Sequence, residues 1–230
     1  MTSHSLRDPA RPGPDLQQGG LRQFWKNNAL STVVFGLFLL FWWGQSLVGW
    51  HNYNGDQVDH GQRAVAYAHY LTTSHFWEAT AENWESEFFQ MGFFVILTVY
   101  LKQRGSAESS KYPDEETPGE GSEQKPGQRA GFLYRNSLSL ALIGLFLASF
   151  AVHVWSGALE YNHEQLLHGG QRVSPLAFLG TSELWFQSLQ NWQSEFLAIG
   201  AMVVLTISLR QEGSSQSKKV DAPNGQTGDE

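Results

Sequence analysis

Two long segments of the chain contain no acidic or basic residue, and this feature limits the possible folds more than any other. Residues 29–50 and 137–159 run for 22 and 23 positions without Asp, Glu, Lys or Arg. An α-helix rises about 1.5 Å per residue, so about 20 residues cross roughly 30 Å of hydrocarbon. Each segment is therefore predicted to be a transmembrane helix. Residues 88–101 and 196–209 are also uncharged but are shorter, with 14 positions each.

The chain repeats itself after 108 residues, and the repeat decides how the shorter segments are interpreted. Residues 28–109 align with residues 136–217 without a gap, and 32 of the 82 positions are identical. Each copy predicts an apolar helix, a polar loop and a second helix. The second helix is expected to begin at a Thr-Ser pair, a natural N-cap, and to end at a Gly-Ser pair. The shorter segments are therefore predicted to be crossings too.

The predicted fold is an all-α membrane protein with four transmembrane helices, arranged as two tandem parallel-repeat helical hairpins. The segments between and around the repeats are rich in Gly, Ser, Pro, Gln and charged residues, a composition typical of disorder. The expected organisation is a disordered N-terminal tail (1–20), a first membrane repeat (21–104), a disordered cytoplasmic linker (105–130), a second membrane repeat (131–212) and a disordered C-terminal tail (213–230).

The distribution of basic residues predicts the orientation. Thirteen of the fifteen lysines and arginines lie before the first apolar segment, between the two repeats or after the last apolar segment. The two inter-helix loops hold one each, Arg63 and Arg172. The positive-inside rule therefore predicts that both termini are cytoplasmic and that both polar loops lie outside.

The repeated motifs resemble a known family. The tandem Asn-Trp-x-Ser-Glu-Phe hairpins, together with Gly-Gln-Ser-Leu in the first apolar helix and Leu-Lys-Gln-Arg-Gly-Ser after the second, are similar to an uncharacterised family of bacterial integral membrane proteins with a domain of unknown function. The resemblance covers residues 24–217. It implies a multi-pass protein of the bacterial cell (inner) membrane, and it implies no activity.

Glu87 and Glu195 are the most conspicuous candidate site residues, because the repeat places a carboxylate inside each second crossing. A charge at that depth is costly and is by default a functional hypothesis. Three interpretations remain open: structural hydrogen bonding between helices, an ion or proton pathway, and a metal or catalytic site. The candidate intramembrane polar site comprises these two glutamates and their motif neighbours Asn83, Asn191, Ser86 and Ser194.

Two neighbouring polar positions differ between the copies. Glu85 corresponds to Gln193, and Gln45 corresponds to His153. Whatever the shared motif does, it does not need those residues in both copies. His153 is expected to bond a neighbouring helix as a neutral imidazole.

His60 and His168 are repeat-equivalent loop histidines and are weak candidates for a metal site on the outer face. The sequence contains no cysteine, no phosphate-binding loop and no hydrolase or zinc-protease motif, so an enzyme is not favoured and no cofactor is predicted. The net charge of −7 offers no basic surface for nucleic acid. The expected function is a structural or interaction component of the envelope. The alternatives are a small ion- or proton-coupled channel or transporter and an outer-face metal-binding protein or enzyme. The expected partners are the lipid bilayer and a second copy in a homodimer.

Overall fold

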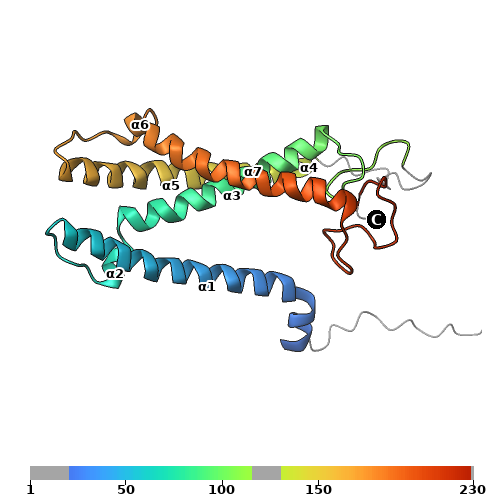
Figure 1. The fold of residues 1–230 in the computed structure, drawn as a ribbon, viewed down its shortest axis with the longest axis horizontal. Helices are drawn as coiled ribbons and strands as arrows, with labels where there is room; N and C mark the ends of the chain where they lie inside the picture. The colour runs from blue at the N-terminus through green and yellow to red at the C-terminus, as the bar shows by residue number, and fades with distance from the viewer. Residues whose placement is uncertain (1–20, 116–130, 229–230) are drawn as a thin grey trace, which may run out of the picture. The chain divides into compact units, whose positions relative to one another are not determined.

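The computed structural model describes residues 21–115 and 131–228, and within these residues it contains helices and no strands. The predicted all-α class is thereby confirmed. The predicted N-terminal tail and residues 116–130 of the predicted linker lie outside the described residues. The helices are α1 (Leu21–Asp59), α2 (Tyr67–Tyr70), α3 (Ser74–Tyr100), α4 (Phe132–Arg135), α5 (Ser137–Leu167), α6 (Pro175–Phe178) and α7 (Ser182–Ser208) (Figure 1).

Two helices are long and apolar enough to cross a membrane. They are α1 over Asn27–Asp59 and α5 over Ser137–Leu167. In the most apolar 18-residue stretch of each helix, only 6% and 11% of the residues, respectively, are buried inside the protein. Their leucine, valine and phenylalanine side chains therefore face outward, unlike those in the core helix of a soluble domain. Neither α3 nor α7 meets the same test, so two of the four predicted crossings are supported by length and composition.

The chain divides into two compact units. The described part of the first unit, residues 21–52, is the apolar stretch of α1. The second unit, residues 53–228 of the described chain, contains the end of α1 and all of the other helices.

The long helices of the second unit begin where the sequence predicts but end earlier. Thr73 caps α3 by accepting a hydrogen bond from the Phe76 amide, and Thr181 caps α7 in the same way. The helices end at Tyr100 and Ser208, five residues before the Gly-Ser pairs. Leu101 and Leu209 are extended, and the chain then folds into a turn in which a serine hydroxyl accepts a backbone amide. These side-chain hydrogen bonds compete with the backbone hydrogen bonds that would continue the helix.

Helix α3 packs against both α5 and α7 and is the centre of the second unit (Figure 1). Gly92 allows the close approach of α3 to α5, because a β-carbon there would stand 3.3 Å from the Leu142 side chain. A small apolar core lies at the other end of the bundle. It is formed by Ala158, Phe178 and Leu184 from α5, α6 and α7.

The loop after the first helix of each copy is held by the same side-chain bonds. The Asn54 amide donates to the Val65 carbonyl and accepts from the Val65 amide, at 3.0 and 2.7 Å. Asn162 does the same with Val173, at 2.8 and 2.7 Å. Each asparagine side chain thus bonds both the N–H and the C=O of one valine. These two bonds fix the point at which the loop returns toward its helix.

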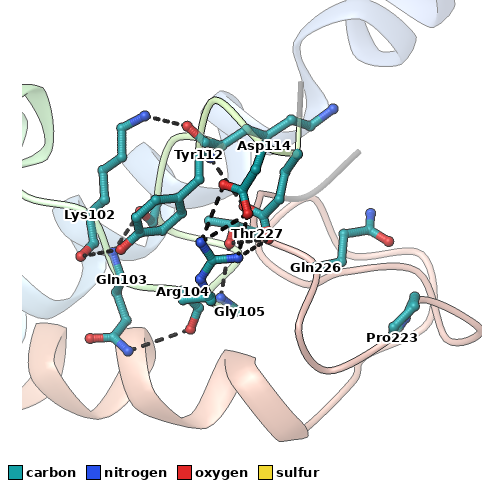
Figure 2. Close-up of polar contacts among 12 residues, drawn as sticks. Lys102, Gln103, Arg104, Gly105, Tyr112, Asp114, Pro223, Gln226 and Thr227 are labelled. Atoms are coloured by element: carbon teal, nitrogen blue, oxygen red, sulfur yellow. Dashed lines mark hydrogen bonds and ion pairs between the residues drawn. The ribbon is translucent and has the colours of Figure 1, made fainter. Parts of the chain in front are cut away.

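At the opposite end of the unit, residues 102–115 and 210–228 form a hydrogen-bonded structure that we call the clasp (Figure 2). The Gly228 amide donates to the Ser106 carbonyl, and the Gly105 amide donates to the Thr227 hydroxyl. Gly105 has a φ of +81°, and a β-carbon there would lie 2.5 Å from the Asn224 carbonyl oxygen. Only glycine fits this position.

Lys218 is the central residue of the clasp and is 1% exposed. Its ammonium donates to five backbone carbonyls at 2.6–3.4 Å, belonging to Gly105, Ile207, Pro223, Asn224 and Gln226. Burial lowers the pKa of this ammonium, and the nearby Arg210 lowers it further. The sequence predicts disorder for residues 105–130 and 213–230. The described parts of both segments contain turns held by hydrogen bonds to carbonyls, and the predicted disorder of these segments stays a prediction.

Candidate functional site

Glu85 on α3 and His153 on α5 form a buried ion pair between the two copies of the repeat. Glu85 Oε2 lies 2.6 Å from His153 Nδ1, and both side chains are 0% exposed. An uncompensated charge in such a place would cost several kcal/mol, about 3–5 when one partner of a buried pair is removed. The two groups therefore hold one another in place.

The hydrogen bonds around His153 assign its protons. The Gln187 amide nitrogen donates to Glu78 Oε1 at 3.0 Å and to Glu183 Oε1 at 3.3 Å. The amide oxygen of Gln187 therefore faces His153 Nε2, at 3.1 Å. Because that oxygen can only accept, Nε2 carries a hydrogen. The remaining proton of the pair lies in the short bond between His153 Nδ1 and Glu85.

Glu85 also bonds two side chains of α7. Its second oxygen, Oε1, accepts hydrogen bonds from the Ser188 hydroxyl and from the Trp192 indole, both at 3.2 Å. His153 on α5 and two donors on α7 thus all bond one carboxyl group on α3. The proton between Glu85 and His153 belongs either to an imidazolium beside a carboxylate or to a neutral acid beside a neutral imidazole, and these two forms are tautomers.

A cavity of about 230 Å³ leads toward this pair from the end of the bundle where α3 and α7 begin. Glu82 lines the cavity and accepts a hydrogen bond from the Asn191 amide at 2.6 Å. Glu78 also lines it and is joined to His153 through Gln187. A cavity rimmed by carboxylates concentrates cations and protons. Five glutamates contribute to it: Glu78, Glu82, Glu160, Glu164 and Glu183.

Aromatic side chains close the opposite side of the pair. Phe89 lies one turn beyond Glu85 on α3 and stacks on Trp192, with ring centroids 4.4 Å apart. It also contacts Phe146 on α5 and Phe196 on α7. This aromatic layer spans the three helices. The pair is fully buried, and Gln187, which bonds His153, is the residue that connects it to the cavity.

Comparison with protein families gives one match. A family described as a domain of unknown function (DUF6766) covers residues 21–229, which is nearly the whole chain. The chain belongs to the DUF6766 family. No curated protein and no solved structure matches it. The match confirms the part of the sequence resemblance that assigns the chain to a family with a domain of unknown function.

In this DUF6766 protein the two glutamates singled out from the repeat occupy different environments. Glu87 is exposed, whereas Glu195 is half-buried. They lie close enough for the charge of Glu87 to act on Glu195, and the Gln90 amide donates to the Glu195 carbonyl oxygen at 3.2 Å. Both residues therefore lie along the contact of α3 with α7. Their functional role stays a prediction.

The asparagines and serines of the motif mostly bond within their own helix. Asn83 is exposed and donates to the Ala79 carbonyl, while Asn191 donates to Glu82 across the helix contact. Ser86 is buried and Ser194 is exposed, and each donates to the carbonyl three residues earlier. Of these four residues, Asn191 alone joins the polar network described above.

The candidate metal residues of the DUF6766 chain do come together. The rings of His60 and His168 have centroids 6.3 Å apart, and both side chains are exposed. Among the described residues, no group of three or more histidines and acidic residues is arranged to hold a metal ion.

The sequence did contain a signal for the buried pair. Glu78, Glu82 and Glu85 follow one another at spacings of four and three, so they share one face of α3. Glu85 and His153 are also among the positions at which the copies differ, and both have glutamine as their counterpart. The structure shows that these two differences contact one another.

Proposed function

We propose that this DUF6766 protein is a multi-pass protein of the bacterial plasma membrane that binds protons at Glu85–His153 and transfers them across the bilayer. The observation that carries the proposal is the short bond between two fully buried ionisable side chains. Such residues are rare within membrane-spanning segments and mark proton relays and ion pathways. The cavity with its five glutamates supplies protons from one side.

In this proposal α3 and α7 also cross the bilayer, through residues 88–101 and 196–209. The chain then has four crossings in two hairpins of the same direction, as the repeat predicts. The distribution of lysine and arginine makes the ends of the chain and the clasp cytoplasmic, and the acid-lined cavity external. The outward-facing apolar side chains of α1 and α5 support contact with lipid.

The aromatic layer around Phe89 favours a gated site over an open pore. Toward the cavity, a proton bound at the pair has neighbours that can accept it in turn, through Gln187 and Glu78. Toward the aromatic rings, the described neighbour that bonds the pair is the Trp192 indole, which only donates a hydrogen bond and offers no acceptor. Release to the cytoplasm then requires α3 and its neighbours to move, as in carriers that expose a site to each side in turn. The protein is accordingly a proton carrier or a proton-coupled transporter.

The decisive experiment uses purified protein in liposomes with a trapped pH indicator and a potassium diffusion potential. Wild-type protein should acidify or alkalinise the lumen according to the sign of the potential. Glu85→Gln and the double variant Glu85→Gln/His153→Gln should lower the rate to that of protein-free vesicles. Glu87→Gln is the matched control on the same helix and should keep the wild-type rate.

Equal rates in all variants would show that protons do not pass through the pair. No flux in the wild type would favour the other function expected from the sequence, a structural component of the envelope. In that case the network of Glu85, His153 and Gln187 serves to fasten three helices together.

A further inference from the structure

His60 and His168 share an arrangement that goes beyond their position in the repeat. His60 follows the last residue of α1, and His168 follows the last residue of α5. Each ring bonds a backbone carbonyl four residues earlier through Nδ1, at 2.8 Å to Asp56 and at 2.9 Å to Glu164. A carbonyl oxygen only accepts, so Nδ1 carries the hydrogen in both rings.

In a neutral ring with this tautomer, Nε2 keeps its lone pair and is the nitrogen that can bind a metal. A hydrogen bond from Nδ1 to a backbone carbonyl is the usual way in which proteins orient a histidine that binds metal through Nε2. Both side chains are exposed, so solvent and ions reach them. The same hydrogen bond thus orients both histidines, and their rings contact one another.

The distance between the rings fits a shared ion. An imidazole bound to zinc at about 2.1 Å has its ring centre about 3.2 Å from the ion, so two such centres lie at most about 6.4 Å apart. The observed separation of the centroids is 6.3 Å. A tetrahedral angle at the metal requires a shortening of about 1 Å, which exposed side chains reach by small rotations.

The electrostatic surroundings favour a cation. Both histidines lie at the C-terminal end of a long helix, where the helix dipole is negative. Acidic residues lie within one turn of each, namely Asp56 and Asp59 before His60 and Glu164 before His168. The nearest basic residues in sequence are Arg63 and Arg172, each three or four positions later.

We propose that His60 and His168 bind one divalent transition-metal ion, with zinc as the reference ion, and thereby link the loops of the two repeats. Imidazole nitrogen suits zinc, nickel and copper(II), whereas calcium and magnesium require oxygen ligands. Water completes the coordination. The site lies apart from the Glu85–His153 pair and does not depend on proton transfer.

The test is equilibrium dialysis of the full chain against zinc, using protein purified in detergent without a polyhistidine tag. Wild type should bind one equivalent. His60→Ala and His168→Ala should each weaken binding by at least about tenfold, the lower end of the loss seen when even a supporting residue of a metal site is removed. His69→Ala is the matched control, because His69 is an exposed histidine of the same unit, in the short helix α2.

Copper(II) bound in place of zinc should show coupling to two nitrogens in its electron paramagnetic resonance spectrum, and to fewer in either single variant. An unchanged equivalent of zinc in His60→Ala/His168→Ala would overturn the proposal, as would the absence of binding to wild type. A zinc-dependent doubling of mass would also overturn it, because the ligands would then come from two copies.

Discussion

Glu85 and His153 are bonded at 2.6 Å, and the positions that correspond to them in the other copy of the repeat are both glutamine. The two charged residues are partners across the contact of α3 with α5. Replacing one of them by glutamine leaves the other buried without its partner.

This relationship predicts the outcome of a double-mutant cycle. Glu85→Gln and His153→Gln should each destabilise the protein by about 3–5 kcal/mol, because each leaves one buried charge unpaired. The double variant should be more stable than the sum of the single effects predicts, by about 0.5–3 kcal/mol. Reversible unfolding in mixed detergent micelles measures all four proteins. Strict additivity would contradict the pairing.

The proposed orientation predicts the labelling of single cysteines, for which the chain is well suited because it contains none. Gln62 and Ser110 are both exposed, on opposite sides of the proposed membrane. A membrane-impermeant maleimide added to intact cells should label Gln62→Cys and leave Ser110→Cys unlabelled until the cells are opened. The reverse pattern would invert the topology.

Arg104 and Asp114 predict a pH response in the clasp. The hydrogen bonds from Arg104 hold the pKa of the Asp114 carboxyl below its ordinary value. The contact is therefore complete above the unfolded pKa of about 3.9 and is lost as the pH falls through the lower folded value. A fluorophore on Ser110→Cys should report this change below about pH 4. In Asp114→Asn the change should be smaller; an identical titration would refute the assignment.

The hydrogen bonds of Lys218 are expected to keep the clasp closed. Lys218→Met removes the ammonium whose three N–H groups the five carbonyls share, and it leaves the buried Gly105 carbonyl without this donor. The free energy needed to open the clasp should fall by about 1–3 kcal/mol, which makes amide exchange about 5- to 150-fold faster. Hydrogen–deuterium exchange at the Gly228 amide, which donates to Ser106, measures it. Lys219→Met is the control, since Lys219 is exposed and should leave exchange unchanged.

Much of the helical framework is predictable from the sequence because it depends on local signals. Thr73 and Thr181 mark the starts of α3 and α7, and two uncharged segments mark the apolar parts of α1 and α5. The helix ends are less predictable, because Gly105 and Gly213 have positive φ but lie in turns that follow the helices.

The site is less predictable because its residues are distant in the chain. Glu85 and His153 are 68 residues apart, and each looks replaceable when its own copy is compared with the other. The repeated motif draws attention to Glu87 instead. Residues 85 and 87 lie about 200° apart around a helix of 3.6 residues per turn, and Glu85 is buried whereas Glu87 is exposed. Comparison of the two copies highlights residues that both copies share, such as Glu87 and Glu195, whereas the buried pair is formed by residues that differ between the copies.

The clasp also has a consequence for the order in which the protein is completed. Lys218 and Gly105 are separated by 113 residues, so a ribosome makes the entire second repeat before the ammonium that binds the Gly105 carbonyl exists. A chain that stops between residues 209 and 217 would contain every helix of the structure and still lack this bond. Closure of the clasp by this bond therefore distinguishes a chain that extends through Lys218 from one that ends just after its last helix.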